Sequence, residues 1–311
     1  MSTINTLATA TLFQQTLDQV VVQEALTGWM EANAGQVLYN GGAEVKIPKI
    51  ALQGLGKYDR DNGYNRGSIT LSYETKTMTQ DRGRKFQLDA MDVNETNFVA
   101  TAATVMGEFQ RVHVVPEIDA YRLSKLITAA ITLDTNITYS YTPAEATILK
   151  EVKKGISKIR NAGYNGELVI HMTADALLEL ETALAGKITD VTFSQGGIDT
   201  RVPSVDKCPI IPTPQNRMYS AITLYDGKTV GQEAGGYVKG ADALEANFII
   251  VPRNVPIAIS KQDVMRIFDP MTNQDANAWA MDYRRFHDLW TLENKENLIY
   301  VNIKDAKPSE E

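Results

Sequence analysis

The chain has 311 residues, a formal net charge of −7 and a single cysteine, Cys208. This length suggests about two domains and is ample for a sizeable buried core. One cysteine excludes an intramolecular disulfide framework and a metal site built from several cysteines, and the acidic balance argues against a protein whose main task is to grip nucleic acid, because that task needs a basic face.

The first segment, residues 1–42, has the pattern of a helix with one apolar stripe. Phe13, Leu17 and Trp29 fall on this stripe at multiples of four residues, a spacing that places side chains on one face of a helix. Two interpretations stay open: a first core helix, or an arm that buries the stripe against another subunit. Because the first cation of the chain is Lys46, the segment has no basic start of a secretory signal and is not a nucleic-acid tail.

Residues 43–90 combine short strand patterns with polar, Gly-rich turns. Apolar residues recur with a period of two at Ile69, Leu71 and Tyr73, and again at Phe86 and Leu88 after a second turn at 81–83. This pattern predicts ribbon-like strands with one apolar side. The stretch is also basic, with Lys57, Arg60, Arg66, Lys76, Arg82, Arg84 and Lys85. A polar segment of this length is usually functional or disordered.

Helical spacing follows. Asp92 and Glu95 form a plausible capping box, and apolar residues then recur at steps of three and four, which predicts one long helix over 93–131 with a kink near Pro116. Thr142-Pro143 marks the start of a further helix that ends near Gly163.

The remainder has an α/β pattern. The sequence predicts a short strand over 168–170, a helix capped by Thr173 that runs to Leu184, and alternating strands and turns over 187–251. Strands joined by a turn at 293–296 are expected over 279–304, and a short tail closes the chain. No apolar run approaches the ~20 residues needed to cross a bilayer.

Motifs that carry chemistry are missing from the sequence. The three histidines, His113, His171 and His287, are too far apart for a helical zinc pair, and the phosphate loop and the nucleophile elbow are both absent. Residues 59–63 only approach a calcium-loop pattern. We interpret His171 as a core or interface histidine and Cys208 as a buried thiol. No catalytic residue, metal or organic cofactor is therefore expected.

Several stretches, in this order, resemble the major capsid proteins of tailed bacteriophages, which have the Hong Kong 97-like fold. AEVKIPKIAL at 43–52 and the polar segment after it resemble the extended loop of that family, and VPEIDAYRLSKL at 115–126 resembles its spine helix. GGIDTRVPSVDKCPIIPTP at 196–214 resembles the axial-domain hairpin, and residues 280–300 resemble the closing strands of the peripheral domain.

The resemblance implies an α+β fold with six parts. These are an N-terminal arm (1–42), an extended loop (43–90), a peripheral domain with the spine helix (91–165), an axial α/β domain (166–251), closing strands of the peripheral domain (252–304) and a tail (305–311). It implies pentamers and hexamers that build an icosahedral shell around double-stranded DNA, without sequence-specific DNA binding or membrane contact. Expected partners are further copies, a scaffolding protein, a portal and decoration proteins. The expected location is the virion, with assembly in the host cytoplasm.

We expect contacts between subunits in two places. The arm would supply Phe13, Leu17 and Trp29, and the basic residues of the extended loop would form an electrostatic clamp on an acidic neighbour. The residues expected in this clamp are Lys57, Arg60, Arg66, Arg82, Arg84 and Lys85. Two alternatives remain: an encapsulin-like nanocompartment shell, and a small-molecule enzyme whose α/β middle holds a pocket.

Overall fold

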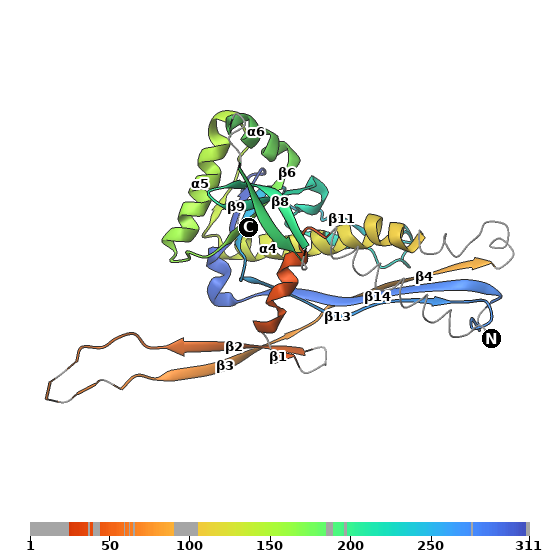
Figure 1. The fold of residues 1–311 in the computed structure, drawn as a ribbon, viewed down its shortest axis with the longest axis horizontal. Helices are drawn as coiled ribbons and strands as arrows, with labels where there is room; N and C mark the ends of the chain where they lie inside the picture. The colour runs from red at the N-terminus through yellow and green to blue at the C-terminus, as the bar shows by residue number, and fades with distance from the viewer. Residues whose placement is uncertain are drawn as a thin grey trace.

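The computed structural model describes residues 25–36, 38–39, 44–58, 60–61, 63–64, 66–89, 105–184, 189–195, 198–274 and 276–308. They form a body with an α/β part above and a long helix over a flat sheet below, and a hairpin projects from one side of this body (Figure 1). The fold is α+β, as the sequence predicted.

A seven-stranded sheet organises the α/β part in the order β5-β15-β12-β6-β9-β8-β7. The pairs β5/β15 and β6/β9 are parallel and the other neighbours are antiparallel. The strands are β5 (Ile137–Thr138), β6 (Leu168–Thr173), β7 (Thr189–Gln195), β8 (Ile198–Val205), β9 (Cys208–Thr213), β12 (Ala246–Pro252) and β15 (Tyr300–Ile303).

Both faces of this sheet are covered, and its central strands are therefore apolar on both sides. On one face, α5 (Glu145–Asn161) and α6 (Ala174–Leu184) pack over Ile170 and Ile250. On the other face, α4 (Val115–Leu133) and the 3₁₀ helix η1 (Gly28–Gln36) pack over Val169. The sequence placed α5 and β15 in the peripheral domain, but β15 is a strand of the seven-stranded sheet and α5 packs on this sheet, together with β6 and α6, which were expected in the axial domain.

A second sheet, β13-β14-β4, is antiparallel and lies along the long helix (Figure 1), and we call it the peripheral sheet. Its strands are β13 (Pro256–Phe268), β14 (Ala278–Thr291) and β4 (Gln80–Asp89). The smaller elements are β10 (Ile222–Leu224), β11 (Tyr237–Lys239) and the 3₁₀ helices η3 (Gln215–Arg217) and η4 (Glu293–Leu298).

The long helix is continuous from residue 105 to Leu133, and the first part of the predicted range, 93–104, lies outside the described residues. It contains a π-helical turn, η2 (Gln110–Val114), directly before Pro116. Proline has no amide hydrogen and its ring clashes with the carbonyl four residues earlier. The wider turn, in which Val115 N–H bonds the Gln110 carbonyl, adapts the helix to this proline.

The projecting hairpin consists of β2 (Glu44–Leu52) and β3 (Ile69–Thr77), with the short β1 (Leu38–Tyr39) at its edge. The turn expected at 81–83 is wrong, because β4 runs straight through these residues and pairs with β14. The projecting hairpin therefore spans residues 44–77, whereas the extended loop was expected over 43–90, and residues 80–89 belong to the body.

The first described residues belong to the subunit core. Trp29 is 1% exposed, and its Nε1–H donates to His171 Nε2 at 3.2 Å. His171 Nδ1 then lies 3.2 Å from Thr213 Oγ1, which fits a neutral imidazole protonated at Nδ1. For Trp29 the core interpretation holds, and the expected contact between subunits is wrong because the side chain packs on its own seven-stranded sheet. Phe13 and Leu17 lie outside the described residues.

Replacing Trp29 by Ala should therefore lower the free energy of unfolding by about 3–5 kcal/mol, the usual cost of deleting a large buried aromatic side chain. Urea denaturation of the unassembled subunit measures this, with Leu178→Ala on the exposed surface as control. Deletion of residues 1–36 should unfold the subunit for the same reason. An unchanged denaturation midpoint in Trp29→Ala would show that Trp29 is not a core residue.

Candidate assembly surfaces

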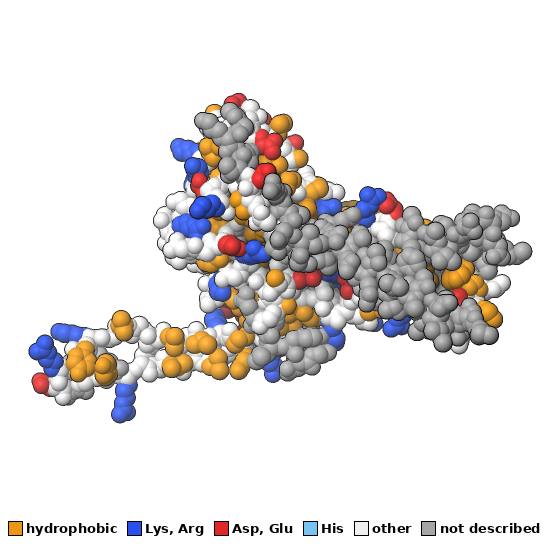
Figure 2. Space-filling model, viewed as in Figure 1, with side chains coloured by type: hydrophobic (Ala, Val, Ile, Leu, Met, Phe, Trp, Pro, Cys, Tyr) orange, Lys and Arg blue, Asp and Glu red, His pale blue; other side chains and the backbone are white. Residues whose placement is uncertain are grey.

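The distal half of the hairpin carries an exposed apolar face. Ile50 opposes Leu71 and Leu52 opposes Ile69, and directly opposed residues of an antiparallel pair point to the same side. These four side chains are 54–75% exposed, and Tyr73 beside them is also exposed. Figure 2 shows hydrophobic side chains gathered along this hairpin. We call these five residues the distal apolar face.

Near the body, the hairpin is apolar on its opposite side. Val45 and Ile47 are buried against Ile257 and Trp290 of the peripheral sheet. Because side chains alternate along a strand, residues 45 and 47 point away from the side that carries residues 50 and 52. The apolar phase of EVKIPKIAL thus shifts at Pro48. One face of the hairpin base packs on its own subunit, and the other face turns apolar as the hairpin leaves the body.

The base of the hairpin is fixed by a buried carboxylate. Thr79 follows β3, and its N–H and Oγ1–H both donate to Asp288 Oδ2 at 2.9 Å. Tyr121 of the long helix donates to Asp288 Oδ1 at 2.7 Å. Burial raises the pKa of Tyr121, so it stays a protonated donor. This arrangement ties the end of the hairpin to both the helix and β14.

The tip of the hairpin carries cations, as predicted for its central part. Lys57, Arg60 and Arg66 are exposed there. Tyr58 and Tyr64 contact each other edge to face, with ring centroids 5.0 Å apart. The contact of these three cations with a neighbour stays a prediction.

The structure moves Arg82, Arg84 and Lys85 from the extended loop to β4. Arg82 forms a two-pronged ion pair with Glu117, with nitrogen–oxygen distances of 2.7 and 3.0 Å, and it also donates to the Tyr225 carbonyl. Arg84 donates to the Glu233 carbonyl at 3.1 Å. Their expected place on the extended loop is wrong, because they lie on a strand of the body, where Arg82 and Arg84 bind the 225–236 segment. Contact of these three cations with a neighbouring subunit stays a prediction.

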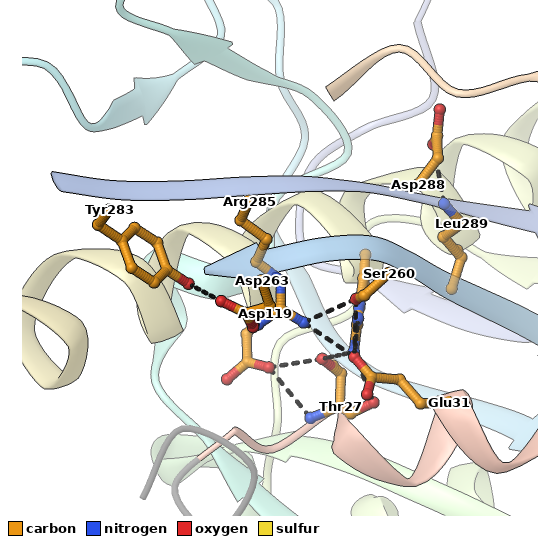
Figure 3. A network of polar contacts seen from close by, with 10 residues as sticks. Thr27, Glu31, Asp119, Ser260, Asp263, Tyr283, Arg285, Asp288 and Leu289 are labelled. Carbon is orange, nitrogen blue, oxygen red and sulfur yellow. Dashed lines mark hydrogen bonds and ion pairs between the residues drawn. The ribbon is translucent and has the colours of Figure 1, made fainter. Parts of the chain in front are cut away.

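A buried polar network joins the first described residues to the long helix (Figure 3). Asp119 Oδ1 accepts hydrogen bonds from Thr27 N–H at 3.0 Å and Thr27 Oγ1–H at 2.6 Å. Asp119 Oδ2 accepts from Leu26 N–H and from Arg217 Nη1, the latter at 2.8 Å. Asp119 itself is fully buried. A single carboxylate thereby links three segments that are far apart in the sequence.

Glu31 makes the second junction. Its Oε1 lies 2.5 Å from Arg122 Nη2 and 2.9 Å from Arg285 Nη2, and Arg285 also pairs with Asp263 (Figure 3). Burial alone would raise the pKa of Glu31, but the two guanidinium groups outweigh it and hold that pKa below its usual value. Sequence reasoning missed this network, although Asp119 and Arg122 are charged residues next to the apolar Ile118 and Leu123 of the helix.

A cavity of about 870 Å³ lies between β4, the start of the long helix and the 225–236 segment. Two of its lining cations form ion pairs, Arg82 with Glu117 and Arg285 with Glu31. Asp288, next to the cavity-lining His287, bonds to Tyr121 and Thr79. Within the described ranges, no group of three or more His, Cys, Asp or Glu side chains could hold a metal ion.

Comparisons with known proteins are informative at the level of structure. No family model matches the chain, and no curated protein matches it. The mature capsid of bacteriophage PhiM1 aligns with a TM-score of 0.55 at 10% identity, over 85% of this chain and 82% of that chain. The capsid of cyanophage P-SCSP1u aligns with a TM-score of 0.53 at 8% identity, over 86% and 84%. The chain has the Hong Kong 97-like fold.

A virus-like particle from Pyrococcus furiosus aligns as well, with a TM-score of 0.53 at 12% identity, over 93% of this chain and 97% of that chain. At such identities the likeness establishes the fold. Among the helices that the structure describes, none is long and apolar enough to span a membrane.

Charge reversal should separate the body cations from the tip cations. Arg82→Glu should lower the melting temperature of the unassembled subunit, because it places a second carboxylate against the half-buried Glu117; breaking such a partly buried pair costs about 1–3 kcal/mol. Arg66→Glu at the exposed tip should leave that temperature unchanged. Differential scanning calorimetry makes the comparison, and equal melting temperatures for the two variants would argue against the placement of Arg82.

Acid should weaken the subunit through its buried histidines. Burial lowers the pKa of His171 to about 3, and burial followed by the charge of Arg285 lowers the pKa of His287 well below its usual value. Below pH 6.5 the unfolded chain binds protons that the folded chain excludes, so stability falls as pH falls. Each histidine should contribute up to ~1.4 kcal/mol per pH unit between pH 6 and pH 4.5.

Urea denaturation across this pH range measures the slope. His171→Gln should remove about half of the slope that the two buried histidines contribute, because one of the two groups that take up a proton on unfolding is then absent. A slope that His171→Gln does not alter would contradict the neutral, buried state of this residue.

Proposed function

We propose that the chain is a major capsid protein that self-assembles, as pentamers and hexamers, into an icosahedral shell around the double-stranded DNA of a tailed bacteriophage. The distal apolar face carries this proposal. The fold shared with the phage capsid structures supports it.

An isolated two-stranded ribbon is marginally stable in water. This one projects from the body (Figure 1) and exposes Ile50, Leu52, Ile69, Leu71 and Tyr73 together. Burial of such side chains contributes roughly 1–2 kcal/mol each when half of their surface is covered. A neighbouring copy that covers this face would bury these side chains and stabilise the ribbon, which explains why the ribbon projects from the body. The contact is therefore mainly apolar, with Lys57, Arg60 and Arg66 at its polar edge.

The remaining parts of the proposal follow from the same role. Phe13 and Leu17 are further candidates for contacts between subunits. A scaffolding protein, a portal and decoration proteins are the proposed partners, the host cytoplasm is the proposed place of assembly, and the role is structural rather than catalytic. No membrane contact or sequence-specific recognition of DNA is part of it.

An encapsulin-like nanocompartment shell is the second candidate, because the virus-like particle from Pyrococcus furiosus is matched over 97% of its length. Shells purified with their natural contents separate the two candidates, since a phage head contains double-stranded DNA and a nanocompartment contains an enzyme.

Sedimentation velocity and negative-stain imaging of the purified protein test the proposal directly. Rings or closed shells are expected at micromolar concentration, with or without a co-expressed scaffolding protein. A stable monomer under all of these conditions would contradict the proposal and favour the enzyme alternative.

Two adjacent residues of β3 provide a matched pair of variants. Leu71→Asp should block assembly, because it places a charge in the apolar contact, and should leave thermal unfolding of the subunit unchanged, because Leu71 is exposed. Ser72→Asp adds the same charge on the opposite face of the strand and should still assemble. Light scattering during assembly measures both. Equal assembly of the two variants would exclude the distal apolar face as the contact.

A further inference from the structure

The exposed side of α5 carries a row of like charges. Lys150, Lys154 and Lys158 fall four residues apart, and Lys153 lies beside them. Like charges at this spacing on a helix repel and destabilise it by a few tenths of a kcal/mol. Lys154 pairs with Glu151 on the same helix, but among the described residues Lys150 forms no ion pair. Lys153 lies 3.8 Å from the nearest carboxylate, at the limit of an ion pair.

The neighbouring helix α6 has the opposite charge. Its sequence, ADALLELETAL, contains Asp175, Glu179 and Glu181 and no Lys or Arg. None of these three carboxylates forms an ion pair with another described residue of the chain. Leu178, between them in sequence, is 62% exposed. The helix therefore presents an acidic surface with an apolar centre.

The two helices pack beside each other on the same face of the seven-stranded sheet, with α5 toward the left and α6 toward the top of the view (Figure 1). In Figure 2, Lys and Arg side chains gather over α5 and Asp and Glu side chains lie over α6. A head-to-tail ring of identical subunits needs two different, complementary surfaces on each copy. The α5 and α6 surfaces meet this requirement.

We infer that α5 of one copy packs against α6 of the next copy around each ring of the shell, so that Lys150 and Lys153 face Glu179 and Glu181. This inference rests on the proposed self-assembly and adds a second contact, separate from the hairpin. Double-stranded DNA is a weaker partner for α5, because the carboxylates of α6 beside it repel phosphates. Complementary charge also fixes the order of copies, since two α5 surfaces or two α6 surfaces repel each other.

A charge swap tests the pairing. The first variant carries Lys150→Glu with Lys153→Glu, and the second carries Glu179→Lys with Glu181→Lys, which places cations near the C-terminal end of α6, where they suit the helix dipole. The third variant carries all four changes. Lys150→Arg with Lys153→Arg is the matched control, because it keeps the charge at the same positions. Thermal unfolding of each unassembled subunit checks the fold.

Each reversed pair alone should raise the concentration needed for assembly by about tenfold or more, because like charges then face each other. The four-residue swap should return this concentration to within about threefold of the wild type. The arginine control should assemble like the wild type, and higher salt should weaken wild-type assembly, since these contacts are at the surface.

Three results would overturn the inference. If the assembly defect of the four-residue swap equals the sum of the defects of the two reversed pairs, the two surfaces do not meet. Normal assembly of both reversed pairs would show that neither surface is an interface. If the α5 variant assembles normally but loses a salt-sensitive affinity for a short DNA duplex that the wild type has, α5 binds DNA and not α6. In each case the wild type still assembles, whereas a wild type that never assembles contradicts the proposed function itself.

Discussion

A two-stranded ribbon that leaves the body of a protein cannot bury its own apolar side chains. Most features of this subunit follow from how that constraint is met. At its base, Val45 and Ile47 pack on the peripheral sheet and Asp288 fixes Thr79. Farther out, the apolar phase moves to the opposite side of the ribbon, where its own subunit offers no cover. The ribbon is thus anchored on one side and open to a partner on the other.

The body that carries the ribbon is held together by buried carboxylates. Asp119 and Glu31 link the first described residues to the long helix, to Arg217 of η3 and to Arg285 of the peripheral sheet. Buried ion pairs contribute little net stability compared with apolar packing, but loss of one partner costs roughly 3–5 kcal/mol. These ion pairs fix the relative positions of the elements, because each one joins a different pair of elements. A shell built from many copies needs this fixed geometry in each subunit.

Local signals in the sequence were sufficient for several elements. The start signals at Thr142-Pro143 and Thr173 and the apolar run of β6 predicted α5, α6 and the strand between them, although α5 begins at Glu145 with Ala144, not Thr142, at its N-cap. The described part of the long helix also agrees with the prediction. These elements depend on spacing and capping within a few residues, which a single sequence displays directly.

Other features depend on distant partners. The polar residues of β4 around Gly83 suggested a turn, and only the pairing with β14, about two hundred residues later, makes them a strand. The stripe that ends at Trp29 has the same pattern whether it meets its own sheet or another subunit, so its burial was not predictable. The shift of the apolar side chains to the other face at Pro48 was visible in EVKIPKIAL. The sequence alone does not tell which of the two faces packs on the body of the subunit.

The central claim is that a neighbouring copy covers the distal apolar face, and Leu71→Cys tests it most directly. The native Cys208 is buried, so a thiol reagent reports on the new residue. The account predicts rapid labelling of the unassembled subunit and strong protection in rings or shells. Equal labelling rates before and after assembly would contradict it.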